Sequence, residues 1–507
     1  MRSKPPSSRS GPRFLRSFPE TTLMILMCAT VNSFAHPGMF ESETNVGRTQ
    51  LAGSVQYDSL RGTYRVTGSG ENMWGNEDAF FFVWRRTSED VTMKTSVAWE
   101  GEGKHPHRKA GWMIRAGLDK DAPYVDAVVH GDGLISMQYR KAKGEITNEV
   151  QYPLKGSASL LLERTGDQFT LSILADDGRL HPVGTVTVEL TGDLYAGLAV
   201  CSHDSSTQET AMFSDVGFQK LEAIAQEQRV LESTLEIIDV QTGLRNIVRR
   251  AKEHFEAPNW TRDGSTLYYN SGGKIYTLPI AGGTPKSLNT AFADRCNNDH
   301  GLSPDGKRFV ISNHDKDGTS RIYVLPIKGG KPRQVTPLGP SYWHGWSPDG
   351  KTLAYCAERN GAYDVYTIPV EGGQEKRLTD APGLDDGPEY SPDGRYIYFN
   401  SVRTGQMKIW RMNADGANQI QLTPNDSYGD WFPHPSPDGK WIVFLSYDKS
   451  VEGHPANKDV VLRIIPIAGG EPRKLAALFG GQGTINVPSW SPDSKRVTFV
   501  SYRLVAP

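Results

Sequence analysis

The second half of the chain repeats one order of apolar runs and polar turns. In the copy around residue 350, an aromatic run (343–346) enters a tight turn and an apolar run (351–356) leaves it. An alternating run (364–369), a Gly-Gly pair and a short closing run (377–379) complete the copy. Short runs with a period of two, bounded by turn residues, predict β-strands. Each copy therefore predicts four strands, the content of one propeller blade.

The tight turn in these copies has the sequence Ser-Pro-Asp-Gly. Proline presets φ at one turn position, aspartate bonds to nearby backbone, and glycine accepts a positive φ. Successive turns are separated by 42, 44, 44, 45 and 55 residues, and a period of roughly 40–45 residues in β structure indicates a propeller. Four complete copies begin at Ser303, Ser347, Ser391 and Ser436, and two looser copies begin at Thr261 and Ser491.

The last copy stops after its second strand, so two strands of that blade are missing at the end of the chain. The runs 235–240 and 245–248, which precede the first copy, have the pattern of a third and a fourth strand. We therefore expect six blades, with the ring closed by strands from both ends of the segment. Closure removes the exposed sheet edges that an open array would leave.

The Ser-Pro-Asp-Gly turns, with the Ile-Tyr-x-Leu-Pro and Gly-Gly elements that follow them, resemble the WD-like repeats of the TolB family. The resemblance covers roughly Leu231 to Pro507 and implies a six-bladed TolB-type β-propeller. It leaves function open, because scaffolds, peptidase domains and carbohydrate-cleaving enzymes share this propeller.

The first half of the chain, from about Gly47 to Phe218, has many strand-like runs but no repeat of this length. Such a pattern predicts a β-sandwich, so the whole chain is expected to be all-β. The order of the segments Met73-Trp74-Gly75, 80–84, 109–115 and 196–200 resembles that of concanavalin-like, laminin-G-like sandwiches. The resemblance implies a module of a carbohydrate-handling protein.

Sugar binding by this sandwich is one interpretation of its aromatic and polar side chains. Core packing is the other, and it is the one we favour for any single aromatic residue. The aromatic candidates are Trp74, Trp84, Trp99, Trp112 and Tyr124, and the polar candidates are Arg115, His130, Gln138 and Arg140. The histidines of His105-Pro106-His107 resemble a metal or anion patch, but solvated loop histidines are the commoner case.

The amino terminus has the pattern of a secretory signal. Basic residues precede an apolar run (23–31) that is too short to span a bilayer, and Ser33-Phe34-Ala35 supplies small residues for cleavage. We therefore expect a signal over 1–35, a sandwich over 36–220, a linker over 221–232 and the propeller over 233–507. This predicts a periplasmic or extracellular protein with no stable membrane span after the signal is removed.

Composition excludes several classes of protein. The 507 residues carry a formal net charge of −2, so no whole-chain attraction to nucleic acid is expected. The four cysteines show no Cys-x-x-Cys spacing. The chain also lacks a Gly-x-Ser-x-Gly elbow, so we expect no hydrolase domain of the type that some propeller proteins carry.

Aligning the six blades on the turn serine or threonine identifies residues that enter the innermost strands. These positions are expected to converge at one mouth of the central channel, and convergent polar groups in a concave site indicate function. The candidate catalytic residues are His300, His344, Asp386 and Glu389. The candidate ligand-binding residues are Asn298, Asp299, Trp343, Asp385, Arg403, Trp431, Gln482 and Asn486. The candidate ligands of a divalent metal, whose identity stays unknown, are His300, His344 and His434.

Three functions are compatible with these features. The first is binding of a carbohydrate or an envelope partner at the channel mouth, with the sandwich as a second candidate surface. The alternative is a metal-assisted polysaccharide lyase or glycoside hydrolase, because oligogalacturonate lyases are propellers with similar repeats that hold a metal on channel histidines. Those enzymes have seven blades and this chain predicts six, so their ligand set is not carried over. A TolB-like transport scaffold is the second alternative, although TolB carries a small α/β domain where this chain predicts a sandwich.

Overall fold

The computed structural model describes residues 37–156, 158–175, 178–221 and 225–507. The predicted signal over 1–35 lies outside these residues. Within the described part, no helix is long and apolar enough to cross a membrane. The described chain is built from strands, with one 3₁₀ turn at Gln226–Gln228.

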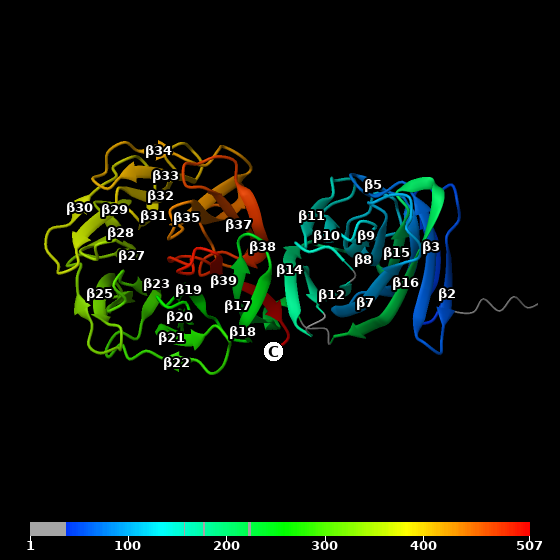
Figure 1. The fold of residues 1–507 in the computed structure, drawn as a ribbon, viewed down its shortest axis with the longest axis horizontal. Helices are drawn as coiled ribbons and strands as arrows, with labels where there is room; N and C mark the ends of the chain where they lie inside the picture. Colours follow the sequence, from blue (N-terminus) through cyan, green and yellow to red (C-terminus); the bar gives the residue numbers. More distant parts are fainter. Residues whose placement is uncertain (1–36, 157, 176–177, 222–224) are drawn as a thin grey trace, which may run out of the picture. The chain divides into compact units, whose positions relative to one another are not determined.

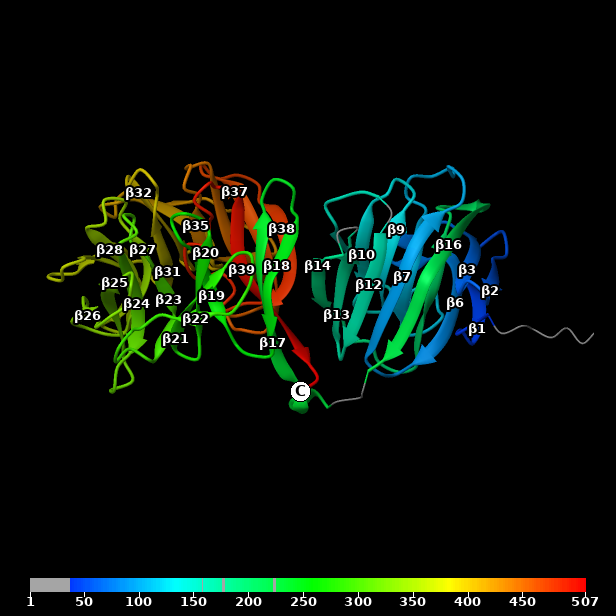
Figure 2. The same ribbon diagram turned by 60° about the horizontal axis from the view of Figure 1, so that its bottom comes forward.

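The first half of the chain forms two seven-stranded antiparallel sheets and a small hairpin (Figures 1 and 2). The first sheet has the order β1 (Ser42–Val46), β6 (Phe80–Thr87), β15 (Leu194–Cys201), β8 (Lys109–Arg115), β9 (Tyr124–His130), β10 (Ile135–Arg140) and β11 (Asn148–Gln151). The second has the order β14 (Leu180–Thr187), β13 (Gln168–Leu174), β12 (Ala158–Thr165), β7 (Val91–Trp99), β16 (Asp204–Lys220), β3 (Thr63–Gly70) and β2 (Ser54–Asp58). The hairpin consists of β4 (Met73–Trp74) and β5 (Glu77–Asp78).

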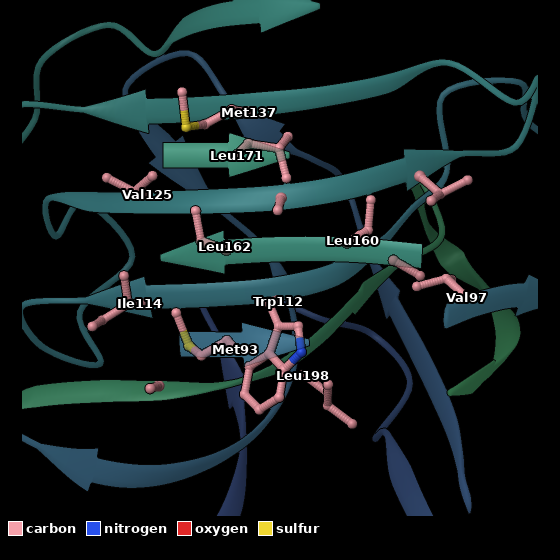
Figure 3. Packing of buried hydrophobic residues seen from close by; sticks show 14 of the residues in the cluster. Met93, Val97, Trp112, Ile114, Val125, Met137, Leu160, Leu162, Leu171 and Leu198 are labelled. Carbon is pink, nitrogen blue, oxygen red and sulfur yellow. The ribbon is translucent and has the colours of Figure 1, made fainter. Parts of the chain in front are cut away.

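One apolar core lies between the two sheets. Trp112 and Leu198 from the first sheet pack with Met93 and Leu162 from the second, and all four are buried (Figure 3). The alternation of buried and exposed positions along β7 fits a strand with one covered face. Strands β8 and β9 are buried along their whole length, because a second cluster that includes Met73 of the hairpin covers the other face of the first sheet.

Two arginines predicted as sugar-binding groups lie in a buried ion-pair network. Arg140 donates to both carboxylate oxygens of Asp78 at 2.8 Å, and Arg115 donates to the same carboxylate at 3.2 Å. All three side chains are fully buried. Buried charges persist when they are paired and hydrogen-bonded, so Arg115 and Arg140 anchor the hairpin to the first sheet and are not ligand contacts. Trp112 and Tyr124 are likewise fully buried.

The second half of the chain forms six sheets around a common axis, as the sequence predicts (Figure 1). Blade 1 consists of β19 (Glu256–Trp260), β20 (Thr266–Ser271), β21 (Lys274–Pro279) and β22 (Lys286–Ser287); blade 2 of β23 (Cys296–Leu302), β24 (Arg308–His314), β25 (Ser320–Pro326) and β26 (Arg333–Gln334). Blade 3 consists of β27 (Ser341–Trp346), β28 (Thr352–Arg359), β29 (Ala362–Pro369) and β30 (Lys376–Arg377). Blade 4 consists of β31 (Asp385–Tyr390), β32 (Tyr396–Ser401), β33 (Lys408–Asn413) and β34 (Ile420–Gln421); blade 5 of β35 (Tyr428–Pro435), β36 (Trp441–Asp448), β37 (Lys458–Pro466) and β38 (Arg473–Gly480).

The sixth blade joins the two ends of the propeller segment. Its sheet has the order β18 (Arg245–Ala251), β17 (Val230–Asp239) and β39 (Arg496–Val505), and Trp490 forms a single bridge to Val497 on the inner side. Strand β17 pairs with β39 along its whole length. The predicted closure of the ring by the runs 235–240 and 245–248 is therefore confirmed.

The repeated turn is held by its own side chains. In the copy at Ser391, the serine hydroxyl donates to Asp393 at 2.6 Å and accepts from the backbone N–H of Tyr396 at 3.0 Å. The glycine of this copy, Gly394, has a φ of 73°. The last copy places Ser494 at the same left-handed position with a φ of 59°, which a non-glycine residue adopts only at some cost.

Candidate functional site

The innermost strands of blades 1 to 5 are each interrupted by a β-bulge. The breaks in register fall between Glu256 and Asn259, Cys296 and His300, Trp343 and Gly345, Asp386 and Glu389, and Trp431 and His434. A bulge inserts unpaired residues and redirects the side chains that follow. Most residues at or before the bulge and most residues after it consequently line two different cavities.

The larger cavity, called here the channel cavity, has a volume of about 530 Å³. All six blades contribute to it, mostly through residues at or before the bulge. Its lining is Glu256, Asn297, Asn298, Asp299, His314, Tyr342, His344, Cys356, Tyr363, Leu384, Asp386, Phe432, His454, Gln482 and Asn486.

The smaller cavity, called the aromatic cavity, has a volume of about 290 Å³ and is lined mainly by residues after the bulge. Four tryptophans line it, namely Trp260, Trp343, Trp346 and Trp490. Several turn prolines, among them Pro304 and Pro348, also line it, as do Asn259, Arg262 and Glu389. Most of the predicted polar site residues lie in the channel cavity instead.

His344 and Asp386 form an ion pair in the channel cavity. The Nε2 atom of His344 lies 3.2 Å from Oδ1 of Asp386, and both side chains are largely buried. Burial alone would lower the pKa of His344, but the Asp386 carboxylate and, to a smaller extent, Asp299 outweigh it and raise the pKa to about 8. Burial would raise the pKa of Asp386, but His344 holds it well below its usual range. At neutral pH the pair is an imidazolium and a carboxylate.

Two further carboxyl groups face the same cavity with pKa values near neutrality. Burial raises the pKa of Glu256 to about 7, with a smaller contribution from the Asp299 charge. Burial also raises the pKa of Asp299 to about 7, against the attraction of His344. Asp299 is 4% exposed, so desolvation of its charged form is close to complete. Each group is part protonated and part ionised at neutral pH.

Amide and aromatic side chains complete the channel cavity. The amide oxygen of Gln482 accepts from Asn486 at 3.0 Å and lies 2.6 Å from Nδ1 of His454. The ring of Phe432 stacks on His344 at 6.2 Å between centroids. The cavity therefore combines hydrogen-bond donors, acceptors, apolar ring surface and groups able to exchange a proton at neutral pH.

Six of the predicted site residues line the channel cavity. They are Asn298, Asp299, His344, Asp386, Gln482 and Asn486. The sequence analysis missed Glu256, Tyr342, Tyr363 and His454 as site residues. A signal existed for Glu256 and Tyr342, because both stand five residues before the turn serine or threonine, as Asn298 and Asp386 do.

His300 and His434 do not join His344. In blade 3 the bulge falls at His344, whereas His300 pairs with Ile311 and His434 pairs with Val443. The ring of His300 is fully buried against Phe309, and burial lowers its pKa to about 3.

His434 is instead held between two neighbouring blades. Its Nδ1 atom lies 2.7 Å from Glu389, and its Nε2 atom lies 2.6 Å from the carbonyl oxygen of Ile485. Among the described residues no group of three or more His, Cys, Asp or Glu side chains is arranged to hold a metal ion. The arrangement thus contradicts the predicted triad of His300, His344 and His434, and it places Glu389 in the aromatic cavity.

Four other predicted ligand-binding residues have packing or ion-pair contacts outside the channel cavity. Asp385 accepts from Arg403 at 2.8 Å, and the guanidinium of Arg403 also lies over the ring of Trp410. Trp343 is 1% exposed, and Trp431 packs against His454 at 4.5 Å between ring centroids. Asp385, Arg403, Trp343 and Trp431 thus support blades 3 to 5 and do not line the channel cavity.

The fold and the cavity at its centre define the class of protein: a six-bladed β-propeller with a polar channel cavity. Comparisons with known proteins narrow this class. The TolB β-propeller domain family matches residues 340–462. An uncharacterised protein of Agrobacterium fabrum, Atu1656, is 50% identical over 273 residues, which are 54% of this chain and 93% of that protein. The chain belongs to the TolB-like β-propeller family.

Two solved structures are similar to parts of this chain. A TolB candidate from Agrobacterium tumefaciens is 49% identical with a TM-score of 0.53, and the match covers 54% of this chain and 99% of that one. TolB from Acinetobacter baumannii is 18% identical with a TM-score of 0.38, over 62% of this chain and 80% of that one.

Proposed function

We propose that this protein is a secreted TolB-like propeller that binds a neutral carbohydrate in the channel cavity. The observation that carries the proposal is the convergence of polar side chains from all six blades on one cavity of about 530 Å³. That volume lies within the range of small-molecule sites, roughly 300–1,000 Å³. Amides, carboxyl groups and imidazoles supply donors and acceptors for hydroxyls, and Phe432 and Tyr342 supply ring surface.

The charge of the cavity favours a neutral sugar over a polyanion. The positive charge of His344 is matched by Asp386. Glu256 and Asp299 add negative charge as the pH rises through about 7. A uronate chain would bring further carboxylates close to these groups, and like charges in a buried site repel strongly.

Acid–base turnover of the bound sugar is the second candidate function. A general base and a general acid work best when their pKa values lie near the working pH. The pKa values of about 7 for Glu256 and Asp299, beside about 8 for His344, meet this condition in one cavity. The reaction would be hydrolysis of a glycosidic bond, in which one of these groups protonates the leaving oxygen while another accepts a proton from the attacking water.

The remaining sequence predictions are parts of the same proposal. The two-sheet unit is taken to be a concanavalin-like module over 36–220, and the segment 1–35 to be a secretory signal that delivers the protein to the periplasm or the exterior. Sequencing of the mature amino terminus tests the second point: it should begin at residue 36. A mature protein that retains Met1 would contradict a cleaved signal.

Calorimetric titration of the full chain with a panel of neutral oligosaccharides tests the binding proposal. Asn298→Ala removes a cavity amide and should weaken binding about tenfold. Glu371→Gln is the matched control, because this exposed carboxylate lies outside the cavity. Failure of every neutral oligosaccharide to bind, with envelope proteins co-purifying instead, would refute carbohydrate binding and favour a TolB-like scaffold.

Product release from the same oligosaccharides tests the second candidate. The rate should be highest between about pH 7 and 8, and Glu256→Gln should lower it by a factor of roughly 10² or more while binding persists. Binding with no product release would rule out turnover and leave the binding proposal standing.

A further inference from the structure

A third cavity, called the sandwich pocket, lies on the first sheet of the amino-terminal half. It has a volume of about 240 Å³. Strands β8 to β11, the hairpin strand β4 and four loops supply its lining, which is Asn72, Trp74, His107, Lys109, His130, Leu134, Gln138, Glu149, Gln151 and His203. None of these residues contributes to the channel cavity.

Two buried residues of the pocket lining each carry a polar atom without a hydrogen-bond partner in the described part of the chain. His130 is 3% exposed and Gln138 is 1% exposed. Neither Nδ1 of His130 nor Oε1 of Gln138 has a hydrogen-bond partner among the residues that the structure describes. Buried polar atoms are nearly always satisfied in folded proteins, so both residues are candidates for contact with a ligand.

The neighbouring side chains fix these two residues in place. The amide nitrogen of Gln138 donates to Glu149 at 3.0 Å, and Nε2 of His130 lies 3.2 Å from the hydroxyl of Ser136. Lys109 donates to Asn72 at 2.7 Å and to the carbonyl oxygen of Met73 at 3.2 Å. An ammonium has three N–H donors, so one donor of Lys109 is left for the pocket.

The indole ring of Trp74 gives the pocket an apolar surface. Trp74 is 39% exposed although it belongs to a hairpin strand, and the Lys109 ammonium lies 5.5 Å from its ring centroid. The rings of His107 and His203 lie on other parts of the lining, with centroids 6.0 Å apart. Indole rings bind apolar faces of ligands while leaving their polar edges free for hydrogen bonds.

The charges that face the pocket are nearly balanced. Lys109 and Glu149 carry opposite charges, and burial, aided by Lys109, lowers the pKa of His130 to about 4, so its ring is neutral at neutral pH. A neutral imidazole offers one donor and one acceptor. The pocket therefore presents mixed donors and acceptors without a cluster of like charges, which disfavours phosphates and other strong anions.

We propose that the sandwich pocket binds one neutral sugar residue, with its apolar face on Trp74 and its hydroxyls on Gln138, His130 and Lys109. A hydroxyl both donates and accepts, so a sugar ring satisfies the free acceptor of Gln138 and the free donor of Lys109 together. The volume of about 240 Å³ suits a single ring more than an extended chain. This site is separate from the channel cavity and does not depend on what that cavity binds.

Ligand-observed NMR of the full chain tests the proposal. The probes are the methyl glycosides of glucose, galactose, mannose and N-acetylglucosamine, each measured separately. At least one should bind, and Trp74→Ala should weaken its binding about tenfold or more, with Trp74→Phe in between. Trp74 is exposed, so these changes are expected to leave folding intact.

A matched control separates this site from the rest of the protein. Trp441 has a similar exposure of 37% and lies on blade 5, so Trp441→Ala should leave glycoside binding unchanged. Absence of binding by all four glycosides, binding insensitive to Trp74→Ala, or binding of a nucleoside such as adenosine alone would overturn the proposal.

Discussion

Replacing Asp299 with asparagine removes a buried carboxyl group while keeping its size. In the folded protein burial raises the pKa of this group to about 7 from an ordinary value of 3.8. The folded state thus holds the proton more tightly than the unfolded state does. As the pH rises from about 4 to about 7, the unfolded chain ionises first and the stability of the protein falls. Above pH 7 the full cost of the buried charge is present.

The size of this effect follows from the shift in pKa. Each unit corresponds to about 1.4 kcal/mol, so a shift of roughly three units makes the ionised carboxylate cost about 4 kcal/mol near pH 8. Near pH 5 the carboxyl group is ionised in the unfolded chain but protonated in the folded protein. The raised pKa then lowers the free energy of unfolding by about 2 kcal/mol. Asn cannot ionise, so Asp299→Asn should stabilise the protein by up to these amounts, with a gain near pH 8 about twice that near pH 5.

Denaturant unfolding of both proteins near pH 5 and near pH 8 measures the difference. Glu371→Gln again serves as the control, because this exposed carboxylate should change stability little at either pH. A gain that is equal at the two pH values would show that the carboxyl group does not titrate in this range. Destabilisation near pH 8 would show that the ionised Asp299 is a net stabiliser, and either result would refute the reasoning about its burial.

Three further predictions concern neighbouring features. The ¹³C NMR signal of His344 should titrate near pH 8, and in Asp386→Asn the midpoint should fall below 6.5, since burial then dominates; an unchanged midpoint would contradict the ion pair. Arg403→Ala should cost about 3–5 kcal/mol in denaturant unfolding because it strands the buried Asp385 carboxylate, and Asp385→Asn in the same chain should restore part of the loss. If Arg403→Ala instead lowered ligand affinity without loss of stability, the result would support the sequence prediction that Arg403 contacts the ligand. Ser391→Ala should cost about 1–2 kcal/mol, because the turn loses a hydroxyl with two bonds; an unchanged denaturation midpoint would argue against this account of the turn.

The turns and strands of the propeller depend on residues that are close together in the sequence, which is why the sequence predicts this fold well. A Ser-Pro-Asp-Gly turn needs only its own side chains and a left-handed glycine such as Gly394. Strands beside such turns follow from the period-two pattern. The number of blades and the closure by residues 235–240 then follow from counting copies, since a ring leaves no unpaired edge.

The direction in which each inner side chain points depends on contacts between strands, and sequence alignment does not contain these. His300 and His344 occupy equivalent positions before their turns, yet His344 lies in a bulge and His300 resumes pairing with Ile311. This difference in register sends the side chain of His344 into the channel cavity and the side chain of His300 into the apolar interior of its blade. The sequence alone therefore establishes the closed ring of six blades and the set of polar residues that surround its axis. The pairing of neighbouring strands decides which of those residues meet, because burial and proximity exist only after the blades have packed.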